Sequence, residues 1–189
     1  VVPIALALEE AGFQRAGSGR SLFKQPQAPT RMLSGDGLES GRHVARYVAI
    51  TGHRGISPDN TIDLQIATAP ENRFGALAKV IIISRAGSEG LDFKFIRQIH
   101  IMEPWYNMNR AEQIIGRGVR HCSHRDLPFA QRNVEIYLYG SILADRTKEA
   151  ADMYVYRFAE QKALQIGRVS RLLKQCSVDC LLNIEQMDF

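Results

Sequence analysis

The chain has 189 residues, of which 45% are hydrophobic and 23% charged, and its formal net charge is +4. This length predicts one domain with a small appendage, and no run reaches the roughly eighteen apolar residues that a membrane span needs. The small positive charge permits nucleic-acid binding without requiring it.

Helices and strands are predicted to alternate along most of the chain. The patterns indicate helices over residues 4–12, 59–68 and 109–115, and strands over residues 46–50, 78–83, 99–102 and 133–139. Such alternation is typical of βαβ units, so we expect an α/β fold with a mostly parallel sheet flanked by helices.

Two segments depart from this alternation. Residues 16–43 are rich in Gly, Ser, Pro and Gln and are interpreted as a long mobile loop, with a lid that orders on binding as the alternative. Residues 147–189 show apolar side chains at helical spacing and predict a helical extension that Gly167 would weaken. We therefore expect a domain over residues 1–146 and an extension over residues 147–189, whose apolar stripe packs on the parent domain or binds a partner.

The cysteines do not form a recognisable framework. Three are present, Cys122, Cys176 and Cys180, and an odd number indicates reduced thiols in an intracellular protein. His121, Cys122 and His124 raise the alternative of a zinc site, but their spacing matches no standard ligand set, so no metal site is predicted.

A glycine-containing loop follows the β-branched run Val80–Ile83. The run predicts a strand buried on both faces, and Gly87 and Gly90 would let the next backbone approach a ligand closely. Ligands of open α/β sheets bind beyond the carboxyl ends of the strands, so this loop is a candidate binding site. The alternative is an ordinary strand-to-helix turn.

Two arginines stand near the end of the helix predicted over residues 109–115. In the segment Gln113–Arg120, Arg117 and Arg120 follow Gln113 and Gly116. Their flat guanidinium groups match phosphate oxygens and stay charged, so together they could hold the terminal phosphate of a nucleotide. The alternative is a solvated basic helix end, where cations also favour the helix dipole.

The order of these segments resembles that of superfamily 2 helicases. Residues 84–92 look like motif V of that family, residues 113–120 look like motif VI, and residues 103–107 resemble the segment between them in Swi/Snf-type translocases and in helicase-like transcription proteins of large DNA viruses. The resemblance implies the second RecA-like lobe of a motor. Residues 3–13 look like the helix after motif IV, so we expect a longer parent protein that supplies the preceding strand.

Site roles follow from the resemblance residue by residue. It implies that Arg117 and Arg120 are catalytic arginine fingers. It also implies that the nucleotide is contacted by Gly87, Gly90, Asp92, Gln113 and Gly116, and the nucleic-acid backbone by Thr51, Gly52, Ser84 and Arg85. Many relatives carry an acidic residue where Arg85 stands and an arginine where Glu89 stands, so these two have open roles, and an Arg85–Glu89 pair is one alternative.

The implied cofactor is ATP with Mg²⁺. The sequence contains no glycine-rich loop ending in Gly-Lys-Ser or Gly-Lys-Thr and no acidic magnesium motif, so the chain is not expected to hydrolyse ATP alone. The implied partners are nucleic acid, DNA rather than RNA, a separate ATP-binding lobe of the same parent, and a transcription complex. No membrane is implied. The location would be the cytoplasm, a viral factory or the virion for a viral protein, and the nucleus otherwise.

Three functions therefore compete. The first is the C-terminal motor lobe of an ATP-dependent helicase or translocase. The second is a nucleotide-inert RecA-like module that binds nucleic acid or protein. The third is a lobe of a Swi/Snf-type duplex DNA translocase. The set of Gln113, Arg117 and Arg120 favours a motor, because a pure binding module would not require it.

Overall fold

The computed structural model describes residues 1–34, 37–85 and 91–178. The chain divides into two compact units. The first comprises Val1–Ile96 and Arg120–Asn133, and the second comprises Arg97–Val119 and Val134–Phe189.

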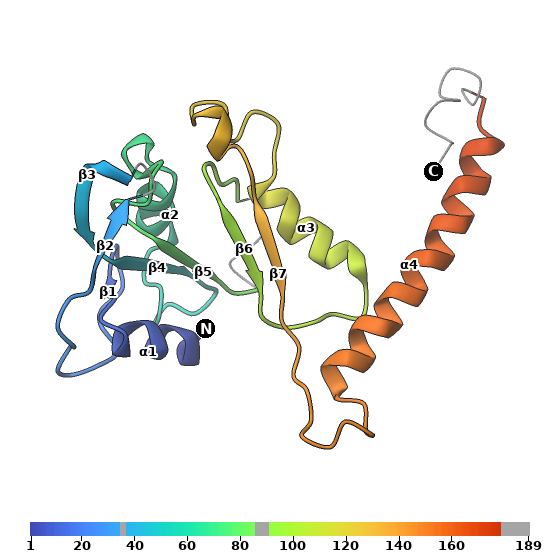
Figure 1. Ribbon diagram of the computed structural model, residues 1–189, viewed down its shortest axis with the longest axis horizontal. Coiled ribbons are helices and arrows are strands. Elements are labelled where there is room, and N and C mark those ends of the chain that lie inside the picture. The colour runs from blue at the N-terminus through green and yellow to red at the C-terminus, as the bar shows by residue number, and fades with distance from the viewer. Residues whose placement is uncertain (35–36, 86–90, 179–189) are drawn as a thin grey trace. The chain divides into compact units, whose positions relative to one another are not determined.

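The first unit is built on a parallel three-stranded sheet (Figure 1). Its strands are β1 (Gln14–Arg15), β4 (Arg46–Ile50) and β5 (Val80–Ile83), in the order β1-β4-β5. The pairing of β4 with β5 runs from Tyr47 opposite Val80 to Ile50 opposite Ile83. The carboxyl ends of these two strands therefore lie together at one edge of the sheet.

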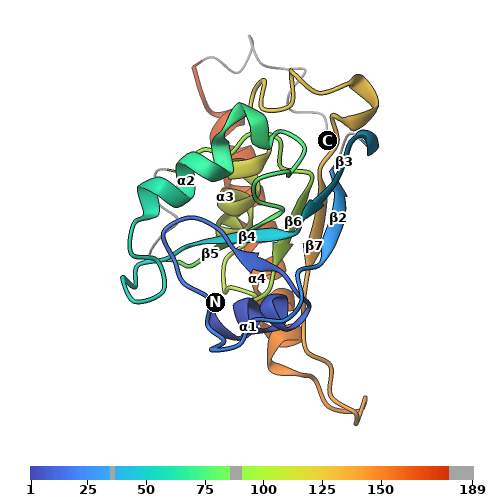
Figure 2. The ribbon, with the colours of Figure 1, turned by 90° about the vertical axis from the view of Figure 1, so that its left-hand side faces the viewer.

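Two helices cover opposite faces of this sheet (Figures 1 and 2). Helix α2 (Asn60–Thr68) contributes Ala67 to a cluster with Val48 and Ile50, whereas helix α1 (Val2–Glu10) contributes Ala5 to a cluster with Tyr47 and Ala49. Alternate side chains of a strand point to opposite faces, so β4 is buried on both. In β5, Ile81 and Ile83 pack on the first cluster and Val80 and Ile82 on the second. The predicted two-sided packing of this strand is confirmed, although only Ile82 is fully buried, because β5 is the edge strand of this three-stranded sheet.

Part of the segment interpreted as a loop forms a β-hairpin. Strands β2 (Arg31–Ser34) and β3 (Gly37–Val44) pair antiparallel, with a register shift between Leu33 and Ser34. The sequence of the hairpin lacks an apolar alternation that would have indicated strands. Two short 3-10 helices, η1 (Pro70–Asn72) and η2 (Phe129–Gln131), complete the first unit.

The second unit pairs β6 (Gln98–Ile101) with β7 (Glu135–Leu138) in parallel. Ile99 and Ile101 are buried on β6, and helix α3 (Met108–Gly118) contacts this strand and helix α4 (Ala151–Gln175). All four residues of β7 are exposed, and within the described residues this strand pairs with β6 alone.

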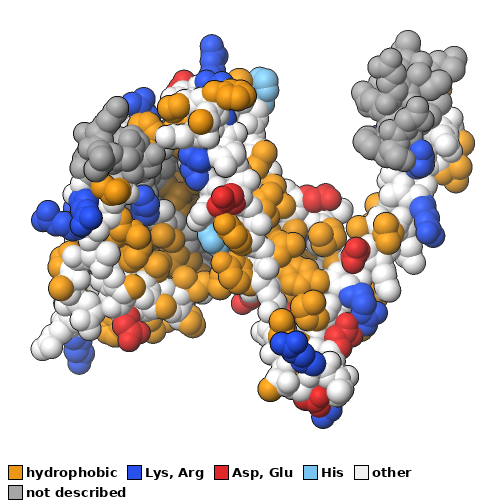
Figure 3. Space-filling model, in the orientation of Figure 1, with side chains coloured by type: hydrophobic (Ala, Val, Ile, Leu, Met, Phe, Trp, Pro, Cys, Tyr) orange, Lys and Arg blue, Asp and Glu red, His pale blue; other side chains and the backbone are white. Residues whose placement is uncertain are grey.

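The predicted fold class is confirmed. The described residues form an α/β fold with parallel sheets, flanking helices and a C-terminal helix, as expected for a RecA-like lobe. Helix α4 continues through Gly167 without a break, and hydrophobic and basic side chains both reach its surface (Figure 3). Within the described residues, no helix is long and apolar enough to cross a membrane.

A buried carboxylate fastens the segment after β1 to the first unit. Glu9 is 4% exposed and accepts hydrogen bonds from the Tyr47 hydroxyl at 2.5 Å, the Ser21 hydroxyl at 2.8 Å and the backbone N–H of Leu22 at 2.8 Å. Burial opposes ionisation of Glu9, but these hydrogen bonds outweigh it and lower the pKa of its carboxyl below the ordinary 4.5. An ionised Glu9 thus holds residues 21–23 in place.

We predict that Tyr47→Phe lowers the free energy of unfolding by about 1–3 kcal/mol at neutral pH, because Glu9 loses its buried hydroxyl donor. The folded-state pKa of Glu9 is depressed, so the stabilisation is present above its unfolded pKa and disappears as the pH falls through the folded value. The deficit of the variant should therefore shrink in acid.

Urea titrations at a series of pH values measure this deficit. Tyr156→Phe is the matched control, because the Tyr156 hydroxyl donates to the Tyr139 carbonyl rather than to an acid. A deficit of Tyr47→Phe that is equal at neutral and acidic pH would contradict the role of Glu9.

Candidate functional site

The turns after β4 and β5 meet at one edge of the sheet. The backbone N–H of Ser84 donates to the Ile50 carbonyl at 3.0 Å, and the backbone N–H of Gly52 donates to the Ser84 hydroxyl at 3.4 Å. Arg85 follows and is exposed. The structure thus brings the four residues predicted to contact nucleic acid, Thr51, Gly52, Ser84 and Arg85, to the same edge.

These residues differ in what they expose. Thr51 is only 4% exposed, and its hydroxyl accepts the backbone N–H of His53 at 3.2 Å within the turn. Gly52 is exposed. A ligand at this edge would therefore meet Gly52 and the side chains beyond β5, whereas Thr51 supports the turn from inside.

An acidic and a basic residue of the predicted nucleotide site are paired in the first unit. The Arg120 guanidinium forms an ion pair with the Asp92 carboxylate, and both side chains are at least half exposed. Gly87, Gly90 and the alternative partner Glu89 lie outside the described residues. The pair joins the end of the predicted motif V segment to the end of the predicted motif VI segment.

The backbone around Arg120 is fixed by its neighbours. Its N–H donates to the Ser123 hydroxyl at 3.3 Å, and its carbonyl accepts the Ser123 N–H at 3.1 Å. The Ser123 carbonyl also accepts the backbone N–H of Phe95 at 3.2 Å. Phe95 has a φ of 64°, an uncommon value for a bulky residue. These contacts tie the loop of Arg120 to the segment after Asp92.

His124, one of the three residues of the alternative zinc site, makes hydrogen bonds within the first unit. His124 Nδ1 lies 2.8 Å from the Ser123 hydroxyl, and Nε2 lies 2.7 Å from the Ile96 carbonyl oxygen. Both ring nitrogens are therefore engaged within the protein, while His121 and Cys122 are exposed. The described residues hold no group of three His, Cys, Asp or Glu side chains suited to a metal ion.

Helix α3 carries the remaining predicted residues, in the second unit. Gln113, Gly116 and Arg117 recur at spacings of three and four, which places them on one face of the helix. Gln113 is exposed, and Arg117 lies in the last turn and is half-buried. The helix is longer than predicted and ends at Gly118. Asn107 stands at its N-cap position, and its side chain makes no capping hydrogen bond.

Gly116 has no packing reason to be glycine within the described chain. A methyl group built on its Cα would have no heavy atom within 4 Å. Glycine inside a helix costs about 1 kcal/mol relative to alanine. Among the described residues there is therefore room for a side chain at this position.

Sequence reasoning missed a buried polar network beneath the strand edge. Arg15 and Asp63 form an ion pair at 3.6 Å with side chains 4% and 0% exposed, and Ser57 and Asn60 lie between this pair and Thr51. No local signal identified these residues, since an aspartate in an amphipathic helix normally marks the solvated face. Gly17, at a φ of 81°, lies so close to the Asp63 carboxylate that a Cβ atom would clash with it. The glycine itself is a sequence signal of this close approach, but it does not identify the partner.

Comparison with known proteins gives one family and several viral relatives. Residues 62–122 match the helicase conserved C-terminal domain. A protein of Acanthamoeba polyphaga mimivirus, classed by its name among ATP-dependent RNA helicases, is 39% identical over 137 residues, which are 69% of this chain and 17% of the relative. A protein of Invertebrate iridescent virus 3, classed as a helicase, is 30% identical over 97% of this chain and 17% of the relative.

A homologue of the termination factor NPH-I from African swine fever virus is 28% identical over 75% of this chain and 21% of the relative. The chain thus spans about a fifth of the length of these relatives. The matched family region includes both the segment from Ser84 to Asp92 and the segment from Gln113 to Arg120.

We predict that Gly116→Ala raises the free energy of unfolding by about 0.5–1 kcal/mol, because alanine favours the helix and meets no neighbouring atom. Gly167→Ala in α4 is the matched control, since its added methyl group also meets nothing within 4 Å. Thermal and urea unfolding measure both variants. Destabilisation by Gly116→Ala would mean that packing within this chain requires the glycine.

Proposed function

Because this chain carries the C-terminal domain of a superfamily 2 helicase, we propose that it is the second motor lobe of an ATP-dependent nucleic-acid helicase or translocase. The observation that carries the proposal is the family match over residues 62–122, which contains both the strand-edge segment and the arginine-bearing segment. The relatives are about five times longer, so the activity belongs to a larger protein.

Arg117 and Arg120 are the proposed arginine fingers. A guanidinium next to a phosphoryl group in transfer stabilises the charge that spreads over its oxygens, and such fingers contribute on the order of 10³–10⁵ in rate. Arg120 is supported by the exposure of its side chain and by the Ser123 hydrogen bonds that fix its backbone. Arg117 is supported by its place at the end of the α3 face that Gln113 begins.

The Arg120–Asp92 pair is suited to exchange. Exposed ion pairs contribute only about 0–1 kcal/mol, because water screens both charges. A nucleotide phosphate carries more negative charge than one carboxylate and matches the guanidinium fork in two places. We infer that Asp92 holds Arg120 ready while the site is empty of phosphate, and that Asp92 then faces the nucleotide.

Gln113 and Gly116 lie on the same face of α3 as Arg117, and we propose that the nucleotide binds along this face. Gln113 offers an exposed amide, and the space over Gly116 lets another group approach the helix backbone. Gly87 and Gly90 are proposed to contact the same ligand through their backbone. ATP supplies the phosphoryl group whose transfer to water releases free energy, and this chain contributes the charges that stabilise that transfer.

Magnesium would be held elsewhere in the parent protein. The described residues offer no three-residue cluster of carboxylate, histidine or cysteine ligands. The proposed partner is therefore a lobe with a phosphate-binding loop and acidic magnesium ligands. Residues 1–146 would form the motor lobe and residues 147–189 an extension.

The strand edge of the first unit is the proposed grip on nucleic acid. The exposed Gly52 backbone, the Ser84 hydroxyl and the Arg85 guanidinium are the kinds of group that bind backbone phosphates, which carry no sequence information. Phosphate contacts also do not sense the 2′-hydroxyl, so the grip alone would hold DNA and RNA alike. The preference for DNA expected from sequence is a separate prediction, and one relative is named as an RNA helicase and another as a homologue of a termination factor.

We predict that Arg117→Ala lowers kcat for ATP hydrolysis by about 10³-fold or more in a protein that joins this chain to its ATP-binding lobe, with a smaller change in nucleotide affinity. Steady-state ATPase assays with saturating oligonucleotide, together with nucleotide titrations, measure both quantities. Arg168→Ala, which removes an exposed arginine of α4, is the control. Unchanged turnover would remove Arg117 from catalysis, and absence of oligonucleotide-stimulated hydrolysis in the parent protein would favour the nucleotide-inert module.

We also predict that Gly116→Ala lowers ATPase activity in the joined protein although it stabilises this chain, because the methyl group fills the space proposed for the nucleotide side. Gly167→Ala should give the same stabilisation with wild-type activity. Equal activities of the two variants would show that nothing approaches α3 at Gly116 during turnover.

A further inference from the structure

The turn after β4 is held at both of its ends by side chains from elsewhere in the first unit. Before the turn, the Ala49 carbonyl accepts hydrogen bonds from the Ser57 hydroxyl at 2.5 Å and from Arg15 at 3.2 Å. After its tip, the Ile56 carbonyl accepts a second hydrogen bond from Arg15, also at 3.2 Å. One buried guanidinium therefore joins the two ends of the turn.

Asn60 fixes the first residue of the turn at two points. Its side-chain amide donates to the Thr51 carbonyl at 2.8 Å, and its side-chain oxygen accepts the Thr51 backbone N–H at 3.2 Å. Both polar groups of Thr51's backbone are thus bound by one side chain. Asn60 is the first residue of α2, which Asp59 caps through the backbone N–H of Thr61 at 2.8 Å. The position of the turn is therefore set by the start of a capped helix.

Asp63 completes the support from below. Its carboxylate lies 3.6 Å from Arg15 and 3.2 Å from the Ser57 hydroxyl, and it accepts the backbone N–H of Ser18 at 2.8 Å. Asp63 is completely buried. Neither Arg15 nor Asp63 can move without leaving a buried charge unpaired, so the support beneath the turn is rigid.

The tip of the turn presents two basic residues to solvent. Residues 52–55 are all exposed, and they include His53 and Arg54. The ring of His53 accepts the backbone N–H of Gly55 at 3.1 Å and so closes the tip on itself. No hydrogen bond or ion pair to another described residue engages the Arg54 side chain. Gly52, two residues earlier in the same turn, donates its backbone N–H to the Ser84 hydroxyl.

We propose that Arg54 is a further phosphate-contacting residue of the strand edge, and that Asn60 is the positioning residue that holds its turn in place. The ligand is the phosphodiester backbone of a nucleic-acid strand, so the inference rests on the nucleic-acid grip proposed above. Arg54 lies on the same turn as Gly52, and Gly52 bonds to Ser84, which precedes Arg85. Two exposed arginines, Arg54 and Arg85, therefore stand in the turns that the Gly52–Ser84 hydrogen bond joins.

A rigid turn distinguishes this arginine from an ordinary solvated one. A guanidinium on a mobile loop loses much of its binding free energy to ordering the backbone when a phosphate binds. Here the backbone is already ordered by Arg15, Ser57 and Asn60, so only the side chain of Arg54 is left to order. Lys and Arg both supply charge to a phosphate, so charge at position 54 matters more than the guanidinium shape.

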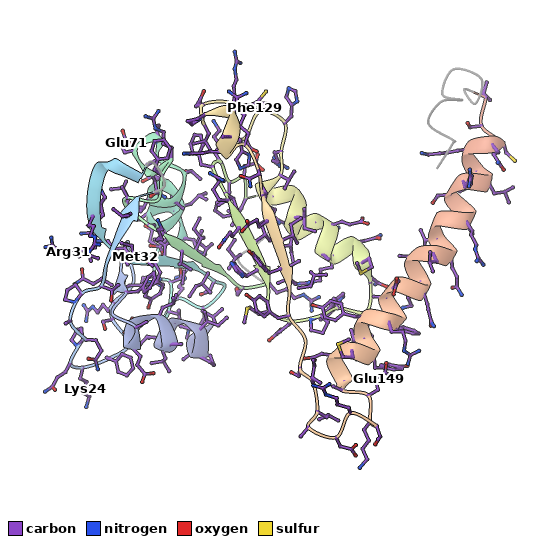
Figure 4. The ribbon with its side chains drawn as sticks, viewed as in Figure 1. Lys24, Arg31, Met32, Glu71, Phe129 and Glu149 are labelled. Atoms are coloured by element: carbon purple, nitrogen blue, oxygen red, sulfur yellow. The ribbon has the colours of Figure 1, made fainter. Side chains whose placement is uncertain are left out.

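The test is the salt dependence of binding to a fluorescein-labelled single-stranded oligonucleotide of mixed sequence, measured by anisotropy on the full chain. We expect Arg54→Ala to weaken binding equally for different sequences and to reduce the slope of log K against log salt by about 0.7. Arg54→Lys should retain the slope. The matched control is Arg31→Ala (Figure 4). Arg31 follows Thr30, whose carbonyl accepts the N–H of Ala45 just before β4 begins, so it lies at the opposite end of that strand.

Asn60→Ala tests the positioning role through a double-mutant cycle with Arg54→Ala. If Asn60 acts by placing Arg54, its removal lowers the salt slope, and the added Arg54→Ala change has little further effect. Additive losses would mean that Asn60 only supports the fold. Circular dichroism establishes that each variant is folded. If Asn60→Ala does not fold, Asn60→Ser replaces it, because it removes the two-point contact with the Thr51 backbone without adding a charge.

The outcomes separate the two proposals. Salt-independent or absent binding by the wild-type chain would overturn the nucleic-acid grip and this inference with it. Salt-dependent binding by the wild type, with an equal slope in Arg54→Ala, would overturn only the role of Arg54. A slope lowered as much by Arg31→Ala would also overturn it, since the effect would then reflect general charge.

Discussion

The parallel pairing of β4 with β5 is the constraint on which the rest of the first unit depends. It ends with Ile50 opposite Ile83, so the chain leaves both strands at the same edge and at the same level. A shift of one residue would reverse which side chains of β5 face α1 and which face α2, and both apolar clusters would be lost. The hydrogen bond from Gly52 to Ser84 is a consequence of this register rather than a cause. The meeting of the two turns at one edge therefore follows from the packed sheet, before the side chains of either turn are considered.

Two arginine–aspartate pairs in the first unit show how burial separates a structural ion pair from an exchangeable one. Arg15 and Asp63 are almost inaccessible to water, and removing one partner of such a pair typically costs about 3–5 kcal/mol because the other charge is left buried. Arg120 and Asp92 are at least half exposed, and a pair of that kind contributes about 0–1 kcal/mol. Burial thus separates two pairs of the same residue types: one fixes the turn beneath the strand edge, and the other is the pair that we propose exchanges for phosphate.

The helices and strands that could be predicted from sequence are those specified by nearby residues, such as an apolar run or a helix cap. The strand over residues 46–50 was predicted with its observed bounds, because an apolar run between polar residues has few alternatives, and α2 was predicted to begin at Asp59, which caps it. The family resemblance, which rested on ordered motifs, is confirmed. The hairpin of β2 and β3 was not predicted, because its pairing joins residues such as Arg31 and Val44 without an apolar pattern. Asp63 was not recognised either, since its partner Arg15 is distant in sequence and meets it only when α2 covers the sheet.

The same distinction explains which parts of the candidate site the sequence could identify. Arg117, Arg120 and Asp92 stand in motifs, and a motif reports groups that meet a ligand. Asn60 and Ser57 make their hydrogen bonds within the protein, to the backbone carbonyls of Thr51 and Ala49. The residue types at these positions therefore depend on the length needed to reach those carbonyls. Residues that meet a ligand are constrained by the chemistry of that ligand, whereas residues that hold a turn are constrained by one backbone conformation that many sequences could support. For the proposed motor lobe, this means that the proposed contacts with nucleotide can be recognised from motifs, while the support that holds the proposed strand contact becomes visible only in the fold.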